Sequence, residues 1–193
     1  MNGRILVVAM LTFELFVACP HVAAASARYV DFRMVMTPLQ ARRYRVVVLT
    51  SLPNGARVTI YATRDFDETI TDKFLPTRVQ ESSGTIFERE LVVSGGRVET
   101  VLEINDDVWL QKRGERAARL APAGTYLSAP RRIRPTVEVR ALFTPMNRAN
   151  PEDVIKATGA KGELIRNAPA TELSVRVLSR VQRLAVPLAI GSK

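Results

Sequence analysis

Apolar and polar residues alternate along much of this chain. In residues 30–36, Val30, Phe32 and Met34 alternate with Asp31 and Arg33. The same pattern recurs in residues 42–50, 57–63, 97–104, 136–143 and 172–178. A period of two places the apolar side chains on one face of a β-strand and the polar ones on the other. We therefore predict six strands, each with one buried face.

Glycine and proline mark the turns between these stretches. Gly95 and Gly96 interrupt the apolar run of residues 91–98, which is typical of a tight hairpin turn. Pro53-Asn54-Gly55 separates the second and third predicted strands. Pro187 lies in the last apolar run, 184–190, which is therefore either an edge strand or irregular. Frequent strands with such turns predict an antiparallel β-sandwich.

Helical signals are few. Asn150-Pro151-Glu152-Asp153 is a typical helix start, with Asn150 as the cap and Gly159 as the end. The basic segment 107–120 is either a short helix or a long loop, and Asp106-Asp107 fits a turn and a helix start. The stretch 144–171 is the least regular and suits an insertion or linker. The predicted fold is all-β, an immunoglobulin-like antiparallel β-sandwich with one or two short helices, over residues 28–193.

The first 27 residues have the pattern of a secretory signal peptide. Arg4 precedes the apolar run 5–13, and Ala25-Ser26-Ala27 forms a small-residue cleavage site. That run is too short to span a membrane, and we expect no transmembrane span in the mature chain. The sequence thus predicts a periplasmic or secreted protein.

Cys19 offers an alternative to this prediction. The preceding Phe16-Val17-Ala18 ends in the small residue that a lipid-bearing cysteine requires, although Pro20 directly after the cysteine fits poorly. Under this alternative the protein is anchored by lipid through Cys19.

Removal of residues 1–27 would take away the chain's only histidine and only cysteine. The mature chain would then lack a Ser-His-Asp triad, a cysteine nucleophile and a zinc site with His or Cys ligands. No Walker loop or dinucleotide fingerprint is present. We expect no cofactor and no enzymatic activity.

Carboxylates are the remaining chemical groups. Asp65, Asp67, Glu68 and Asp72 follow a predicted strand, where they form either an acidic solvated loop, a calcium loop or a pair for glycoside hydrolysis. We favour the solvated loop.

The net charge is +9, and arginine supplies most of the positive charge. Guanidinium groups bind phosphate and carboxylate through paired hydrogen bonds, so an arginine-rich surface suits polyanions. Arg131, Arg132 and Arg134, between Pro130 and Pro135, are the candidate polyanion-binding residues. The plainer interpretation is a solvated basic face. Aromatic residues are scarce among the basic ones, so we expect no nucleic-acid partner.

Several segments together resemble immunoglobulin-like exported proteins of bacteria, including periplasmic pilus-chaperone-like proteins. A signal peptide leads into a strand at 29–36, and residues 42–50 are expected to pair with 57–63 across the Pro-Asn-Gly loop. Pro122-Ala123-Gly124-Thr125-Tyr126 and the closing stretches 177–180 and 185–188 also fit. The resemblance implies strand addition to an exposed sheet edge.

Two functions are therefore expected from the sequence. The first is a non-enzymatic module that binds another exported or surface protein, as an assembly chaperone or an accessory subunit of a surface structure. The alternative is an envelope protein that binds an acidic polymer through its arginine surface.

Overall fold

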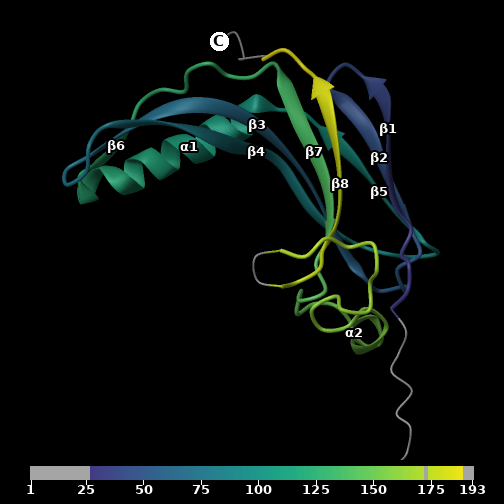
Figure 1. Ribbon diagram of the computed structural model, residues 1–193. Helices are drawn as coiled ribbons and strands as arrows, with labels where there is room; N and C mark the ends of the chain where they lie inside the picture. The colour runs from purple at the N-terminus through teal and green to yellow at the C-terminus, as the bar shows by residue number, and fades with distance from the viewer. Residues whose placement is uncertain (1–26, 172–173, 189–193) are drawn as a thin grey trace, which may run out of the picture.

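The computed structural model describes residues 27–171 and 174–188, and it confirms the all-β prediction. Two antiparallel sheets pack face to face (Figure 1). One sheet has the order β1 (Phe32–Gln40), β2 (Arg43–Thr50), β5 (Arg97–Glu103). The other has the order β4 (Arg78–Val92), β3 (Arg57–Asp72), β7 (Thr136–Phe143), β8 (Leu178–Ala185), with β6 (Thr125–Leu127) also paired to β3.

The core forms between the two sheets from the inward positions of the alternating strands. Val46 and Leu102 of one sheet, and Ile60 and Val139 of the other, belong to one buried cluster and are fully buried. The predicted strands 42–50, 97–104 and 136–143 match β2, β5 and β7, and 30–36 overlaps β1. Burial of these alternating side chains is the main stabilising contribution to the sandwich.

The last predicted strand is misplaced. Residues 172–173 lie outside the described residues, and 174–177 form no strand beyond an isolated bridge of Arg176 to Ala170. The strand β8 begins at Leu178 instead, and residues 186–188 are irregular. β8 is an edge strand with Arg180 and Arg183 exposed, so its hydrophobic pattern is weaker than that of the apolar stretch before it.

Both tight turns join the two sheets rather than paired strands. The Pro-Asn-Gly turn leads from β2 to β3 and the Gly-Gly turn from β4 to β5, so the expected pairing of 42–50 with 57–63 is wrong. Gly96 has φ +71°, and a Cβ there would lie 2.9 Å from the Thr50 carbonyl oxygen. The glycine is needed because the chain passes directly under the end of β2.

The strands β3 and β4 are the longest of the described strands, with 16 and 15 residues. Typical strands have about 5–6 residues, so these two extend well beyond the sandwich. In Figure 1 they curve away from it as an arm, with α1 (Asp106–Leu120) along the concave side. We call β3, β4, β6 and α1 beyond the sandwich the arm. The acidic stretch 65–72 is therefore strand, and its prediction as a loop is wrong.

The helical alternative for 107–120 is correct. Asn105 caps α1 by accepting a hydrogen bond from the Asp107 N–H, and the short 3₁₀ helix η1 (Ala121–Ala123) follows. The second helix, α2 (Glu152–Thr158), ends at Gly159 as predicted. None of the helices in the described part of the chain is long and apolar enough to cross a membrane.

Asn150 does not cap α2, contrary to the sequence prediction. Its amide oxygen accepts from the Arg57 N–H and its amide nitrogen donates to the Thr144 carbonyl, so it ties the loop after β7 to the start of β3.

Candidate functional site: the projecting arm

A buried charge cluster lies where the arm leaves the sandwich. The Asp106 carboxylate accepts hydrogen bonds from Arg64 Nε at 2.7 Å, from Arg42 Nη2 at 2.5 Å and from Trp109 Nε1 at 2.9 Å. The Arg64 and Asp106 side chains are fully buried. Arg64 also donates to the carbonyls of Arg134 and Val186. The cluster therefore joins the turn between β1 and β2, strand β3, helix α1 and the C-terminal segment at one point.

These contacts set the charge state of Asp106. Desolvation raises the pKa of this carboxyl, but the hydrogen bonds from Arg64, Trp109 and Arg42 outweigh it. The pKa of Asp106 is therefore held below its ordinary value, and the group is ionised at neutral pH.

A second buried carboxylate holds α1 against the arm. Glu68 points to the concave side of β3 and is 1% exposed. Its carboxylate lies 3.2 Å from Arg113 Nε and 3.8 Å from Arg116 Nη1, and it accepts from the Ser82 hydroxyl at 2.7 Å. Trp109 adds an apolar contact by stacking on Phe66 at 4.8 Å between ring centroids.

One edge of β3 in the arm is closed by the segment 125–134. β6 pairs with residues 70–72, and beyond it Asp67 exchanges two backbone hydrogen bonds with Arg131. The N–H groups of Ser128 and Arg134 donate to the carbonyls of Thr69 and Asp65. The backbone groups of Asp65, Asp67 and Thr69 therefore point away from β4.

The outer edge of β4 in the arm is open. Among the described strands, β4 pairs only with β3. Ser83, Glu81 and Val79 stand opposite Asp65, Asp67 and Thr69 in the antiparallel register. Residues directly opposite each other point their backbone groups either both inward or both outward. The N–H and C=O groups of Ser83, Glu81 and Val79 thus lie along the open edge.

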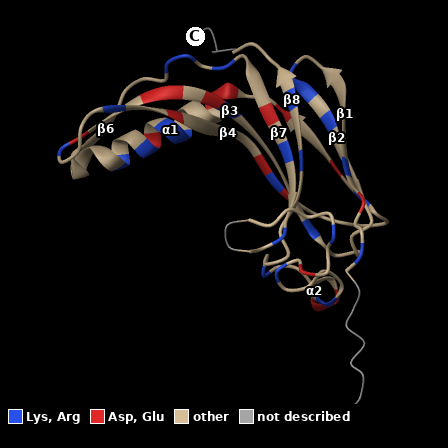
Figure 2. Cartoon of the chain, viewed as in Figure 1, with Lys and Arg blue, Asp and Glu red and all other residues tan. Residues whose placement is uncertain are grey.

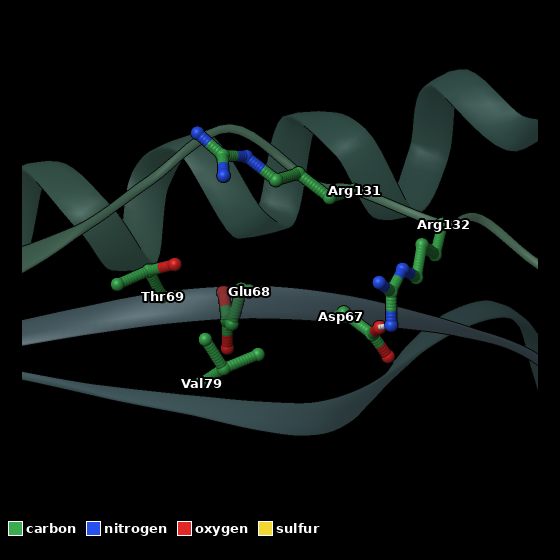
Figure 3. Close-up of a pocket in the computed structure, with 6 residues that line it drawn as sticks. All are labelled: Asp67, Glu68, Thr69, Val79, Arg131 and Arg132. Atoms are coloured by element: carbon green, nitrogen blue, oxygen red, sulfur yellow. Dashed lines mark ion pairs between the residues drawn. The ribbon is translucent and has the colours of Figure 1, made fainter.

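The three candidate arginines follow one another along the closed edge, but they differ in their partners. Arg132 and Arg134 both face Asp67, at 3.7 Å and 3.4 Å, and Arg134 also faces Glu81 at 3.5 Å. Arg131 is exposed, and its guanidinium forms no ion pair with any described residue. In Figure 3 its side chain points away from Asp67. The structure thus brings the three together but leaves one guanidinium available.

A hollow of about 330 Å³ lies beside these arginines. It is lined by Asp67, Glu68, Thr69, Val79, Arg131 and Arg132 (Figure 3). The charges around it are mixed, and Figure 2 shows the same mixture across the arm, with basic residues on α1 and on the segment 131–134 and acidic residues on β3.

The acidic residues of β3 do not converge on one site. Asp65 and Asp67 lie on the convex face and Glu68 on the concave face, because successive side chains of a strand point to opposite sides. Asp65 accepts from the Ser83 hydroxyl, and Asp72 accepts from the Thr125 hydroxyl. The described residues contain no cluster of three or more acidic, His or Cys side chains that would hold a metal ion.

The buried charges, and the place of the open edge on β4, were not predicted from the sequence. The signal for the arm was present, since alternation continues through Arg64, Phe66, Glu68 and Ile70. Two of these four inward residues are charged, which hides the period of two.

The comparison with protein-family models found no match, and the comparisons with curated proteins and with solved structures found no significant match. The class that the fold defines is therefore an all-β sandwich with a projecting, helix-backed hairpin arm.

Proposed function

We propose that this protein is an exported, non-enzymatic module that binds another exported or surface protein by adding a strand of that partner to the open edge of β4. The observation that carries the proposal is this edge. Its backbone donors and acceptors at Val79, Glu81 and Ser83 are directed outward on the projecting arm. Added strands gain affinity from such main-chain hydrogen bonds.

Among the described strands, the other three sheet edges are less suited to strand addition. β5 and β8 are about half as long as β4 and carry exposed charges, as in Arg97 and Glu99 of β5. The β1 edge is partly covered, since Gln182 donates to the Met34 carbonyl and Asn167 bonds the backbone of Val30.

The projecting half of β4 is also sparsely charged. Between Val79 and Phe87, Glu81 is its only charged residue. Long edge strands with few charges are prone to pair with other chains, and natural proteins usually protect them. The absence of such protection on β4 supports the proposal that a strand of a partner protein pairs with this edge. The resemblance to exported immunoglobulin-like proteins implies the same mode of binding.

Export is the second part of the proposal. We expect cleavage after Ala27, so that the protein recovered from the cell envelope begins at Arg28. N-terminal sequencing or intact-mass measurement tests this expectation. A chain that begins at a lipidated Cys19 would contradict free release, and a chain that retains Met1 would contradict export.

The binding mode is tested by two substitutions at one position. Glu81→Pro removes an outward N–H without touching the ladder to β3, whereas Glu81→Ala removes the side chain and keeps the N–H. Partners cross-linked in the native host's envelope are quantified by mass spectrometry. We expect Glu81→Pro to reduce the recovered partner about tenfold, and Glu81→Ala to leave it near the wild-type amount.

Wild-type recovery with both variants would contradict strand addition at β4. An equal loss with both would instead assign the contact to the Glu81 carboxylate. We expect the thermal unfolding of each variant to match that of the wild type, because the Glu81 side chain is exposed and lies beyond the sandwich.

Of the three candidate arginines, only Arg131 supports the polyanion alternative, because its guanidinium forms no ion pair with a described residue. Heparin is a suitable probe. If this alternative holds, Arg131→Ala lowers the affinity for heparin more than Arg132→Ala does, because Asp67 already neutralises Arg132. Arg131→Ala should also make the remaining affinity less sensitive to salt.

A further inference from the structure

The turn between β3 and β4, at the far end of the arm, exposes large apolar side chains. The exposed fractions are 81% for Phe74, 54% for Leu75, 71% for Val79 and 59% for Tyr126. Val79 pairs with Thr69 and Tyr126 with Thr71, so both side chains lie on the convex face close to the turn. The arm thus ends in an apolar tip, which we define as these four exposed residues.

The tip is held in shape by its own hydrogen bonds. Asp72 accepts from the Phe74 N–H at 2.8 Å and from the Thr125 hydroxyl at 2.6 Å. The Lys73 N–H donates to the Gly124 carbonyl at 3.0 Å, which ties the turn to the segment after α1. The apolar side chains are therefore presented by an ordered turn, at no further cost in backbone ordering on binding.

Cationic groups surround the tip. Lys73 and Arg78 flank the turn, and Arg119 lies in the last turn of α1 beside it. None of the three forms an ion pair with a described residue, and Lys73 Nζ lies 5.5 Å from the centre of the Phe74 ring. The nearest acidic group, Asp72, is already engaged by Thr125 and Phe74. The tip therefore presents exposed apolar side chains with positively charged side chains near them.

We propose that this tip docks on the surface of a lipid bilayer that contains anionic lipids. Phe74 and Leu75 enter the interface between headgroups and acyl chains, and Lys73, Arg78 and Arg119 contact the lipid phosphates. Aromatic rings favour that interface, and basic residues near an anionic surface add attraction. The tip is convex and projects from the molecule (Figure 1), a shape that penetrates a soft interface better than it complements a folded protein surface.

Vesicle binding tests the proposal with a fluorescent reporter. Trp109 is the chain's only tryptophan and is 1% exposed, so Phe74→Trp adds a single exposed indole. Vesicles of phosphatidylcholine with phosphatidylglycerol should shift the emission of this introduced indole to the blue, and brominated lipids should quench it. Val35→Trp, on β1 of the sandwich, is the matched control and should show neither effect.

Affinity separates the apolar from the charged contribution. Phe74→Ser with Leu75→Ser should weaken binding to the anionic vesicles by about tenfold or more, since each removes a large apolar side chain that the bilayer would otherwise cover. Lys73→Gln with Arg78→Gln should weaken it about fivefold per charge, and salt should do the same. Vesicles of phosphatidylcholine alone should bind correspondingly less.

Three results would overturn the proposal. They are unchanged emission of the Phe74→Trp variant with anionic vesicles, equal binding by the Phe74→Ser, Leu75→Ser variant, and equal affinity for both vesicle types. An emission shift of the Phe74→Trp variant caused by the protein partner and not by vesicles would assign the tip to a protein interface instead. Glu81→Pro should leave vesicle binding unchanged, so failure of strand addition is separately detectable.

Discussion

At the scale of single residues, Asp106 joins several parts of the structure through one side chain. Its buried carboxylate is the shared acceptor of Arg42, Arg64 and Trp109, which come from three different parts of the chain. A buried ion pair adds little net stability over an apolar pair, but removal of one partner leaves the other charge buried and uncompensated. The main role of Asp106 is therefore to fix the geometry at the base of the arm, and not to add net stability beyond what an apolar residue would give.

Asp106→Asn tests this role. The amide has the same shape but no charge, so Arg64 keeps its burial and loses its counter-ion. We expect the free energy of unfolding to fall by about 3–5 kcal/mol, measured by urea denaturation. Asp107→Asn, at the next and exposed position, is the control and should cost well under about 1 kcal/mol. Equal effects of the two substitutions would contradict the role of the buried cluster.

Gly84 is constrained by a neighbouring side chain rather than by its backbone. A Cβ at this position would lie 2.6–2.8 Å from atoms of the Trp109 indole, which packs directly on the strand. Gly84→Ala should therefore force the indole off Phe66 and destabilise the protein by about 1–3 kcal/mol. Gly114→Ala is the opposite control, because no atom lies within 4 Å of its Cβ position and alanine favours the helix. The near-ultraviolet circular dichroism of Trp109 reports the displacement, and an unchanged spectrum would contradict it.

At the scale of elements, α1 packs against the strands of the arm, and the buried Glu68 carboxylate holds α1 in place. Arg113 and Arg116 reach the buried Glu68 carboxylate from the helix. Arg113 also donates to the Ser128 carbonyl, which connects the helix to the closed edge of β3. The two-stranded part of the arm is therefore backed by a helix that is held by charge as well as by apolar packing.

Glu68→Gln should loosen this helix selectively. The amide keeps a hydrogen bond to Ser82 but no longer attracts the two guanidinium groups. Hydrogen exchange of the α1 amides should become faster while that of β7 stays unchanged. Glu115→Gln, an exposed change on the same helix, should leave both rates near wild type. Uniform acceleration across α1 and β7 would show a global effect and contradict the local one.

The elements also show why the sequence predicts the sandwich better than the arm. In β2, β5 and β7 every inward position is uncharged, and apart from Thr50 and Thr100 these positions are apolar or aromatic, so alternation alone identifies the strands. In β3 the inward row includes Arg64 and Glu68, whose partners Asp106 and Arg113 lie 42 and 45 positions further along the chain. A single sequence contains no signal that pairs such distant residues. The candidate arginines were identified from the sequence. Which of them pair with Asp67 and which one stays in solvent depends on β3, whose extension into the arm was not predicted.

At the scale of the whole molecule, residues 28–193 contain no side chain that ordinarily titrates between about pH 5 and 7. The chain's one histidine is His21, within the predicted signal peptide. The carboxyls of Asp106 and Glu138 have pKa values below their ordinary range. For Asp106 the bonds from Arg64, Trp109 and Arg42 exceed the desolvation, and for Glu138 the hydrogen bond from Arg140 is the main cause.

The pH dependence of stability follows from these directions. A lowered folded-state pKa contributes stability that is complete above the unfolded-state value of about 4 and is lost as the pH falls through the folded value. The free energy of unfolding should thus be nearly constant from about pH 5 to about pH 7 and decline below about pH 4. Urea denaturation of a protein comprising residues 28–193, at a series of pH values, measures this dependence, and a marked change within the neutral range would contradict the assignment. In the Asp106→Asn variant the free energy of unfolding should fall less steeply below about pH 4, because the titrating carboxyl is absent.

The closed edge of β3 has a consequence for symmetry. Because the segment 125–134 occupies that side, the described part of the arm offers only one long edge to another chain. Two copies that met through this edge would pair β4 with β4 about a two-fold axis, and each would use up the other's edge. Such an assembly closes at the dimer and cannot grow into a fibre, so the placement of one short extended segment limits the stoichiometry of association.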